Sequence, residues 1–301
     1  MTPIDLSPFE AWLRSRDRSA HTVRNYLSDL RQFGTWFRQT ADTELSPPLV
    51  TPLDIRDYRQ YLQTVRRLKA ATVNRKLAAI SVWLDWALDA GLLLDVNPAK
   101  NVRGVRSSQR VAKWLSRRDE GKVLRVLGRE LNAARTVPAR RKALRNRALV
   151  VLILNTGLRA EEALSLRLPD LEIKARSGNV LVRSGKGNKE RSVPLNKNAR
   201  NALREWLAVR PSDTDYVFTS QKGGRWSGAG ARAAMQEIAR VAGVEAHLHT
   251  LRHTFAKRLV DAGVSLEKVA ALLGHSNLNT TRIYTAPGES DLEDAVGKLE
   301  Y

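Results

Sequence analysis

Side chains suited to phosphodiester chemistry gather at three places in the second half of this 301-residue chain. Arg159 follows a Thr-Gly-Leu sequence, and Arg252 ends a His-x-x-Arg sequence that begins at His249. Further on, Tyr284 lies nine positions after His275. Guanidinium groups bind phosphate bidentately, imidazole transfers protons near neutral pH, and a phenol can act as a nucleophile. In this order, these residues suggest a site that holds a phosphodiester and attacks it.

The two arginines are the predicted phosphate clamp, because a guanidinium stays charged and matches the geometry of phosphate oxygens. A single arginine among 51 Lys and Arg residues would ordinarily be a surface charge, but the sequences around Arg159 and Arg252 favour the site. Tyr284 is the predicted nucleophile. An unperturbed phenol has a pKa of about 10, so it needs a base and a cationic surrounding to attack at neutral pH.

The order and spacing of these residues resemble the tyrosine recombinase (phage integrase) family, most closely its Xer-like members, over nearly the whole chain. The resemblance implies that Arg159 and Arg252 bind the phosphate. It also implies that His249 accepts the proton of Tyr284 and that His275 donates a hydrogen bond to the phosphate. His253 follows Arg252 directly and points elsewhere on a helix, so a structural role is expected for it, and His247 matches no family position.

The remaining catalytic position is expected in a glycine-rich turn, Gly185-Lys186-Gly187-Asn188. Lys186 in this turn is, by the same resemblance, the general acid for the leaving 5′-oxygen, with Lys189 as its rival. The phosphate-loop spacing G-x-x-x-x-G-K-[ST] is absent, which disfavours nucleotide binding. Glu162 lies three residues after Arg159, within reach on one helix face, and the family acid there supports the arginines.

The activity that the resemblance implies is site-specific DNA recombination or integration. Tyr284 would form a 3′-phosphotyrosyl link, the 5′-hydroxyl of a partner duplex would attack that link, and exchange would pass through a Holliday junction. Bond energy is conserved, so no cofactor, metal or ATP is expected. The implied partners are double-stranded DNA and three further subunits, giving a homotetramer or, with a related recombinase, a heterotetramer.

Two other classes remain open: a type IB topoisomerase-like enzyme and a non-catalytic DNA-binding regulator. A basic segment over residues 132–147 is longer than expected for a compact Xer protein, which favours a mobile element over chromosome-dimer resolution.

Composition agrees with a polyanion as partner. The formal net charge is +20 and the sequence pI is about 10.8, and residues 101–147 alone carry 15 Lys and Arg against three acids. There is no cysteine, which excludes disulfides and thiolate chemistry. No apolar run is long enough to span a membrane and no secretory signal opens the chain, so a cytoplasmic protein is expected.

Periodicity predicts a mainly α fold with a small antiparallel sheet in the C-terminal domain. Residues 1–100 read as an all-α core-binding domain, with helices after Ser7, Ser19, Thr51 and Thr72. Residues 101–113 have the composition of a basic linker. Together the two domains would clamp DNA. The predicted DNA contacts are Arg103, Arg106, Arg110, Lys113, Lys189 and Arg191.

Residues 114–301 are the predicted α+β catalytic domain. Its strands are expected at 171–173, 179–183 and 191–194, and a buried helix from Leu144 to Leu154 should lead into the first arginine. Residues 289–301 form a predicted C-terminal helix. Its apolar stripe, which includes Leu292, Val296 and Leu299, could pack within the subunit or, by the resemblance, on a neighbouring one.

Overall fold

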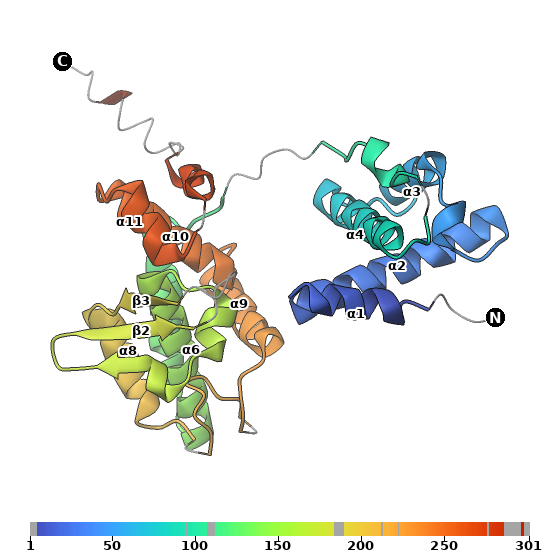
Figure 1. The fold of residues 1–301 in the computed structure, drawn as a ribbon. Helices are drawn as coiled ribbons and strands as arrows, with labels where there is room; N and C mark the ends of the chain where they lie inside the picture. The colour runs from blue at the N-terminus through green and yellow to red at the C-terminus, as the bar shows by residue number, and fades with distance from the viewer. Residues whose placement is uncertain are drawn as a thin grey trace. The chain divides into compact units, whose positions relative to one another are not determined.

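Helices dominate the computed structural model, which describes residues 5–93, 95–106, 112–183, 190–211, 213–221, 223–275, 277–285 and 296–297. The chain divides into two compact units, residues 1–109 and 110–301, so the division falls inside the segment with linker composition. The mainly α fold with one small antiparallel sheet is confirmed, and Figure 1 shows the sheet in the second unit.

The first unit is built from four helices with two short 3₁₀ turns, η1 (Pro47–Leu49) and η2 (Pro98–Asn101). Two helices begin where predicted: Ser19 caps α2 (Ala20–Ala41), and Thr51 forms a capping box with Asp54 at the start of α3 (Pro52–Thr64). Their buried faces meet in one apolar core that includes Phe33 and Trp83. The helices are α1 (Ser7–Ser15), α2 (Ala20–Ala41), α3 (Pro52–Thr64) and α4 (Ala70–Asp89).

The beginning of the predicted linker packs on this unit. The Asn74 side chain donates to the Val105 carbonyl oxygen at 2.9 Å and accepts from its backbone N–H at 2.8 Å. Arg59 donates to the carbonyl oxygen of Arg103 at 2.6 Å. Linker composition did not reveal this, because it is side chains on α3 and α4 that satisfy the backbone of the segment.

The second unit places a three-stranded sheet among seven helices of the described chain. The strands β1 (Leu171–Ile173), β2 (Gly178–Val182) and β3 (Arg191–Pro194) form an antiparallel sheet in the order β1-β2-β3. Val180 lies opposite both Leu171 and Val193. The first and last strands have the predicted bounds, and the middle strand begins and ends one residue earlier than the predicted 179–183. The elements are α5 (Arg117–Ala133), α6 (Val137–Thr156), α7 (Ala160–Ser165), η3 (Leu168–Asp170), β1 (Leu171–Ile173), β2 (Gly178–Val182), β3 (Arg191–Pro194), α8 (Lys197–Leu207), α9 (Gly228–Ala242), α10 (Leu248–Asp261), α11 (Leu266–Leu273), η4 (Leu278–Thr280) and η5 (Arg282–Tyr284).

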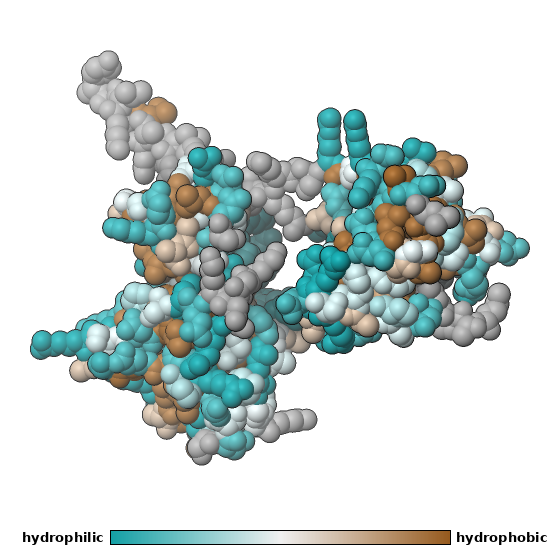
Figure 2. All heavy atoms as spheres, in the orientation of Figure 1, coloured by the Kyte–Doolittle hydropathy of each residue, from teal (hydrophilic) through white to brown (hydrophobic). Residues whose placement is uncertain are grey.

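Helix α6 is the centre of this unit. Its second half is apolar and buried, as predicted for residues 144–154, and α5, α8, α9 and α10 all pack against it. Most of the basic segment 132–147 is the first half of this same helix, which begins after the Thr136 cap. Five of the six Lys and Arg residues of this segment therefore lie on one continuous helix. Figure 2 shows hydrophilic residues covering much of the visible face of each unit.

The predicted C-terminal helix, residues 289–301, lies outside the described residues except for positions 296–297, which are helical. None of the helices that the structure describes combines the length and the apolar character needed to cross a membrane.

Candidate active site

A tight turn after α6 positions the first arginine. Gly157 ends the helix in the left-handed conformation at φ +65°, which favours glycine. Glycine is also required because a Cβ at this position would overlap the Phe255 ring. Two residues later Arg159 precedes α7, and its backbone N–H donates to Glu162 Oε2 at 2.8 Å. The Gly-Leu-Arg-x-x-Glu sequence is therefore a helix end, a turn and a helix start in succession.

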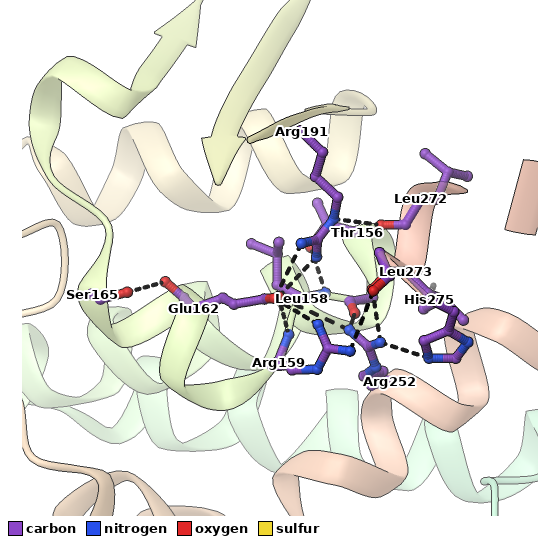
Figure 3. Close-up of polar contacts among 12 residues, drawn as sticks. Thr156, Leu158, Arg159, Glu162, Ser165, Arg191, Arg252, Leu272, Leu273 and His275 are labelled. Atoms are coloured by element: carbon purple, nitrogen blue, oxygen red, sulfur yellow. Dashed lines mark hydrogen bonds and ion pairs between the residues drawn. The ribbon is translucent and has the colours of Figure 1, made fainter. Parts of the chain in front are cut away.

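Three arginines converge on the Glu162 carboxylate, as Figure 3 shows. Arg159 Nη1 donates to Oε1 at 2.8 Å, and Arg191 donates to both oxygens at 3.1 and 2.8 Å. Arg252 Nη1 lies 3.9 Å from Oε2. One carboxylate for three guanidinium groups leaves a net charge of +2, so this cluster favours binding of an anion.

Glu162 stays ionised although it is only 7% exposed. Burial alone would raise its pKa, but hydrogen bonds from Arg191 and from the Arg159 backbone outweigh that effect, and the net pKa lies below the usual value. The carboxylate therefore holds the guanidinium groups together at neutral pH.

Arg252 is the most enclosed member of the cluster, with 1% exposure. Its Nη1 donates to the Gly157 carbonyl oxygen at 2.7 Å and its Nη2 to that of Leu273 at 2.8 Å. Burial lowers the pKa of Arg252 to about 10, so the group remains charged at neutral pH. This one side chain thus joins α10 to the turns after α6 and α11.

His275 follows α11, which ends at Gly274 in the left-handed conformation. Its Nε2 lies 2.9 Å from Arg252 Nη2, and its Nδ1 lies 3.0 Å from Thr281 Oγ1. A guanidinium can only donate, so Nε2 accepts here and Nδ1 carries the proton. His275 was predicted to donate to phosphate, whereas in this arrangement its Nε2 accepts from Arg252.

Tyr284 lies on η5 and is 1% exposed, in a small apolar cluster with Phe255, Val269 and Leu273. Its hydroxyl lies 2.7 Å from His253 Nδ1. Burial raises the pKa of Tyr284, although the charges of Arg252 and Arg159 oppose that effect. The predicted nucleophile and both predicted clamp arginines therefore belong to one electrostatic site.

His253 lies at the phenol, although a structural role was predicted for it and His249 was predicted to accept the Tyr284 proton. The hydrogen bond that the structure describes at the Tyr284 hydroxyl is with His253 Nδ1, and the role of His249 stays a prediction. His249 is exposed, and its ring contacts the His253 ring edge-on at 4.3 Å between centroids. The four-residue spacing of His249 and His253 contained the missed signal, because residues four apart are neighbours on one face of a helix.

Arg191 also differs from its prediction as a DNA contact. Besides its bonds to Glu162, its Nε donates to the Leu272 carbonyl oxygen at 3.0 Å, and its side chain is 13% exposed. It therefore serves the anion-binding cluster from within the protein. Its place next to a basic turn gave no sign of this, because the contact depends on how β3 meets α7 and α11.

The other predicted DNA contacts divide into two groups. Arg103, Arg106 and Lys113 are exposed, and Lys113 makes a surface ion pair with Glu245 at 2.8 Å. The predicted general acid and the remaining basic positions lie outside the described residues; they are Lys186, Lys189 and Arg110. Within the described chain, no group of three or more His, Cys, Asp and Glu side chains is arranged to hold a metal ion.

Comparison with known proteins identifies the family of the chain. Residues 126–290 match the Phage integrase family, and residues 7–91 match the phage integrase N-terminal SAM-like domain. The tyrosine recombinase XerC of Shewanella oneidensis is 32% identical over 291 residues, covering 93% of this chain and 88% of that protein. XerC of Alcanivorax borkumensis is 34% identical over 279 residues, covering 90% and 84%.

A solved structure extends the likeness to the fold. The XerH site-specific recombinase, bound to a palindromic difH substrate in a post-cleavage complex, matches with a TM-score of 0.74 and 26% identity over 96% of this chain and 84% of that one. The chain therefore belongs to the phage integrase family and is a Xer-like tyrosine recombinase, an enzyme of site-specific DNA breakage and rejoining.

Proposed function

We propose that the chain binds specific sites in double-stranded DNA and cleaves them with Tyr284 while the Glu162 cluster holds the scissile phosphate. The observation that carries this is the convergence of three guanidinium groups on one carboxylate beside a buried phenol. The cluster keeps two positive charges that can bind a phosphate. The Arg159 side chain is 41% exposed, so it is accessible to the DNA. XerH bound to difH DNA supports DNA as the substrate.

In the proposed reaction the Tyr284 oxygen attacks phosphorus and the bond to the 5′-oxygen breaks. Lys186 gives a proton to that oxygen, leaving a 3′-phosphotyrosyl link and a 5′-hydroxyl. The 5′-hydroxyl of a partner duplex reverses the step through a Holliday junction. Because one phosphodiester replaces another, the step needs no energy from ATP, and arginines can stabilise the charge that develops.

Phosphate binding would rearrange the hydrogen bonds at Arg252. Both of its terminal nitrogens already donate to carbonyl oxygens, and Nη2 also donates to His275. A phosphate oxygen can take the N–H that His275 now accepts. His275 would then be free to shift its proton to Nε2 and donate to the phosphate, as the family resemblance implies.

The wider assembly is part of the same proposal. Residues 1–100 serve as the core-binding domain, 101–113 as the basic linker and 114–301 as the catalytic domain, all on DNA in the cytoplasm. Four subunits assemble on two synapsed sites, either as copies of this chain or with a related recombinase. The stripe Leu292, Val296 and Leu299 docks on the neighbouring subunit, and the chain serves a mobile element or Xer-like resolution.

A covalent-trapping assay tests the proposal. Sites would first be selected from a random DNA library by the wild-type protein, then nicked next to the scissile phosphate so that the released fragment diffuses away. Tyr284→Phe removes one hydroxyl, so binding should persist while the covalent adduct disappears from denaturing gels. Tyr216→Phe, at a phenol that packs against Arg167 in the same domain, is the matched control and should retain the adduct. A persistent adduct in Tyr284→Phe would reject this nucleophile.

A further inference from the structure

The hydrogen bond between His253 and Tyr284 has a chemical consequence beyond orientation. Its length is 2.7 Å, and it joins the atom that attacks phosphorus to an imidazole nitrogen. Among the hydrogen bonds of the described residues, this is the one that reaches the phenol oxygen. A phenol is a strong donor and neutral imidazole has one nitrogen free to accept, so the pair fits Tyr284 donating to Nδ1.

We propose that His253 accepts the proton of Tyr284 as the phenol attacks, and returns it when the phosphotyrosyl link is broken. This rests on the proposed role of Tyr284 as the nucleophile. In cleavage the P–O bond to Tyr284 forms, the bond to the 5′-oxygen breaks, and the phenol proton moves to His253 Nδ1. The 5′-oxygen receives a separate proton from Lys186. In rejoining each transfer runs backward.

Helix α10 fixes this acceptor relative to the phosphate site. Arg252 and His253 are consecutive residues of one helix, so the clamp and the acceptor are attached to the same rigid backbone. His249 lies one turn earlier, and its ring rests edge-on against His253. His249 is thereby a positioning residue, which keeps the His253 ring facing η5.

His253 is neutral at pH 7, so one of its ring nitrogens is free to accept a proton. Burial, followed by the neighbouring His249, Arg252 and His275, lowers the pKa of His253 to about 4, so it is neutral at pH 7. Burial raises the pKa of Tyr284, so without DNA the proton stays on the phenol. A bound phosphate brings a negative charge that favours the imidazolium, which links proton transfer to the presence of substrate.

The rate of adduct formation as a function of pH tests this acceptor. His253→Ala removes it, and His253→Asn keeps a hydrogen-bond acceptor near the Nδ1 position that cannot take up a proton. His247→Asn is the matched control, an exposed histidine that precedes α10. Each variant would be assayed on nicked DNA at saturating protein, with DNA affinity and thermal unfolding measured in parallel.

We expect His253→Ala to slow cleavage by about 10²–10⁴-fold at pH 7, the usual contribution of a general base. Its rate should then rise about tenfold per pH unit, because hydroxide must remove the proton, whereas the wild-type rate stays flat between pH 6 and 8. His253→Asn should show the same slope. Replacing the 5′-oxygen by sulfur should rescue Lys186→Ala but not His253→Ala, since a better leaving group does not need the acid.

Several outcomes would overturn the proposal. These are wild-type or faster cleavage by His253→Ala, full rescue by His253→Asn, and a slower rate with an unchanged pH profile. The tenfold slope appearing in His249→Ala and not in His253→Ala would move the acceptor to His249. An adduct in Tyr284→Phe would reject the nucleophile itself, which distinguishes that failure from a failure of the acceptor alone.

Discussion

The phosphate-holding half of the active site and its attacking half are built in opposite ways. In the first, Glu162 on α7 is surrounded by Arg159 just before α7, Arg191 on β3 and Arg252 on α10. Arg252 and Glu162 are almost fully buried. In the second, Tyr284 lies on a single 3₁₀ turn, and among the described residues its hydroxyl makes one hydrogen bond, to His253. Only the first half is held by many mutually dependent contacts.

This difference indicates which half can move. Separating a buried charge from its partners costs about 3–5 kcal/mol, so the arginine cluster is held in place before any substrate arrives. The Tyr284 hydroxyl is held by a hydrogen bond worth about 1 kcal/mol net and by the packing of its ring, so η5 can adjust its position while the bond to His253 is kept. With the phenol 1% exposed, we expect the attacking half to shift toward a phosphate that the fixed half has already bound.

The largest effect is expected from Glu162→Gln, which leaves three guanidinium groups without their shared charge. The free energy of unfolding should fall by about 3–5 kcal/mol. Glu161→Gln is the matched control, because its partner Arg225 is a surface contact, and it should cost under about 1 kcal/mol. Urea unfolding of both variants measures the difference. Equal losses would show that the cluster is no more tightly built than the surface.

The pH dependence of that loss follows from the pKa of Glu162, which folding depresses below its ordinary value of 4.5. A depressed carboxyl pKa adds stability above the unfolded-state pKa, and the stability disappears as pH falls through the folded-state pKa. The gap between wild type and Glu162→Gln should therefore be full above about pH 4.5 and shrink in more acidic solution. A gap that widened in acid would contradict this charge assignment.

A slightly smaller effect is expected from Arg252→Lys. An ammonium cannot bond to Gly157, Leu273 and a phosphate together in the way a planar guanidinium can. Cleavage of nicked DNA should slow by about 10²–10³-fold, while much of the DNA affinity persists. The control is Arg258→Lys on the same helix, an exposed residue paired with Glu120, which should cleave normally. Unimpaired cleavage by Arg252→Lys would contradict the role of Arg252 in binding the phosphate.

The smallest effect concerns Thr281, which connects the two halves. Its hydroxyl accepts from His275 Nδ1, and Thr281→Val removes that acceptor with little change of shape. Losing about 1 kcal/mol from the hydrogen bond that orients the His275 ring should slow cleavage by roughly five- to tenfold. Thr280→Val, at the exposed neighbouring position, should have no effect. A loss of several hundredfold would show that the two halves are more tightly coupled than this contact allows.

The sequence predicts the fixed half better than the attacking half. Arg159 and Glu162 are three residues apart, and the spacing alone placed them together. The strands were also recognisable from alternation and turn residues. Arg191 lies next to a basic turn and was predicted to contact DNA. Its hydrogen bond to Glu162 could not be predicted, because it spans 29 positions of the chain, a separation that local periodicity does not reach.

His253 was missed for a different reason. Its neighbour Arg252 points into the cluster, and consecutive helix positions point in different directions, so a structural role looked natural. The direction of His253 mattered only once η5 had placed Tyr284 beside it, which is a tertiary contact across 31 positions. Similarly, His275 was expected to donate, and the tautomer followed only from its distances to Arg252 and Thr281.

The most direct test of the whole account is to identify the residue that becomes bound to DNA. Wild-type protein trapped on nicked DNA would be digested with nuclease and protease, and the peptide that carries the remaining nucleotide would be sequenced by mass spectrometry. We expect a nucleotide 3′-phosphate on Tyr284 and on no other residue. A modified Tyr301, or a modification on any residue other than Tyr284, would contradict it.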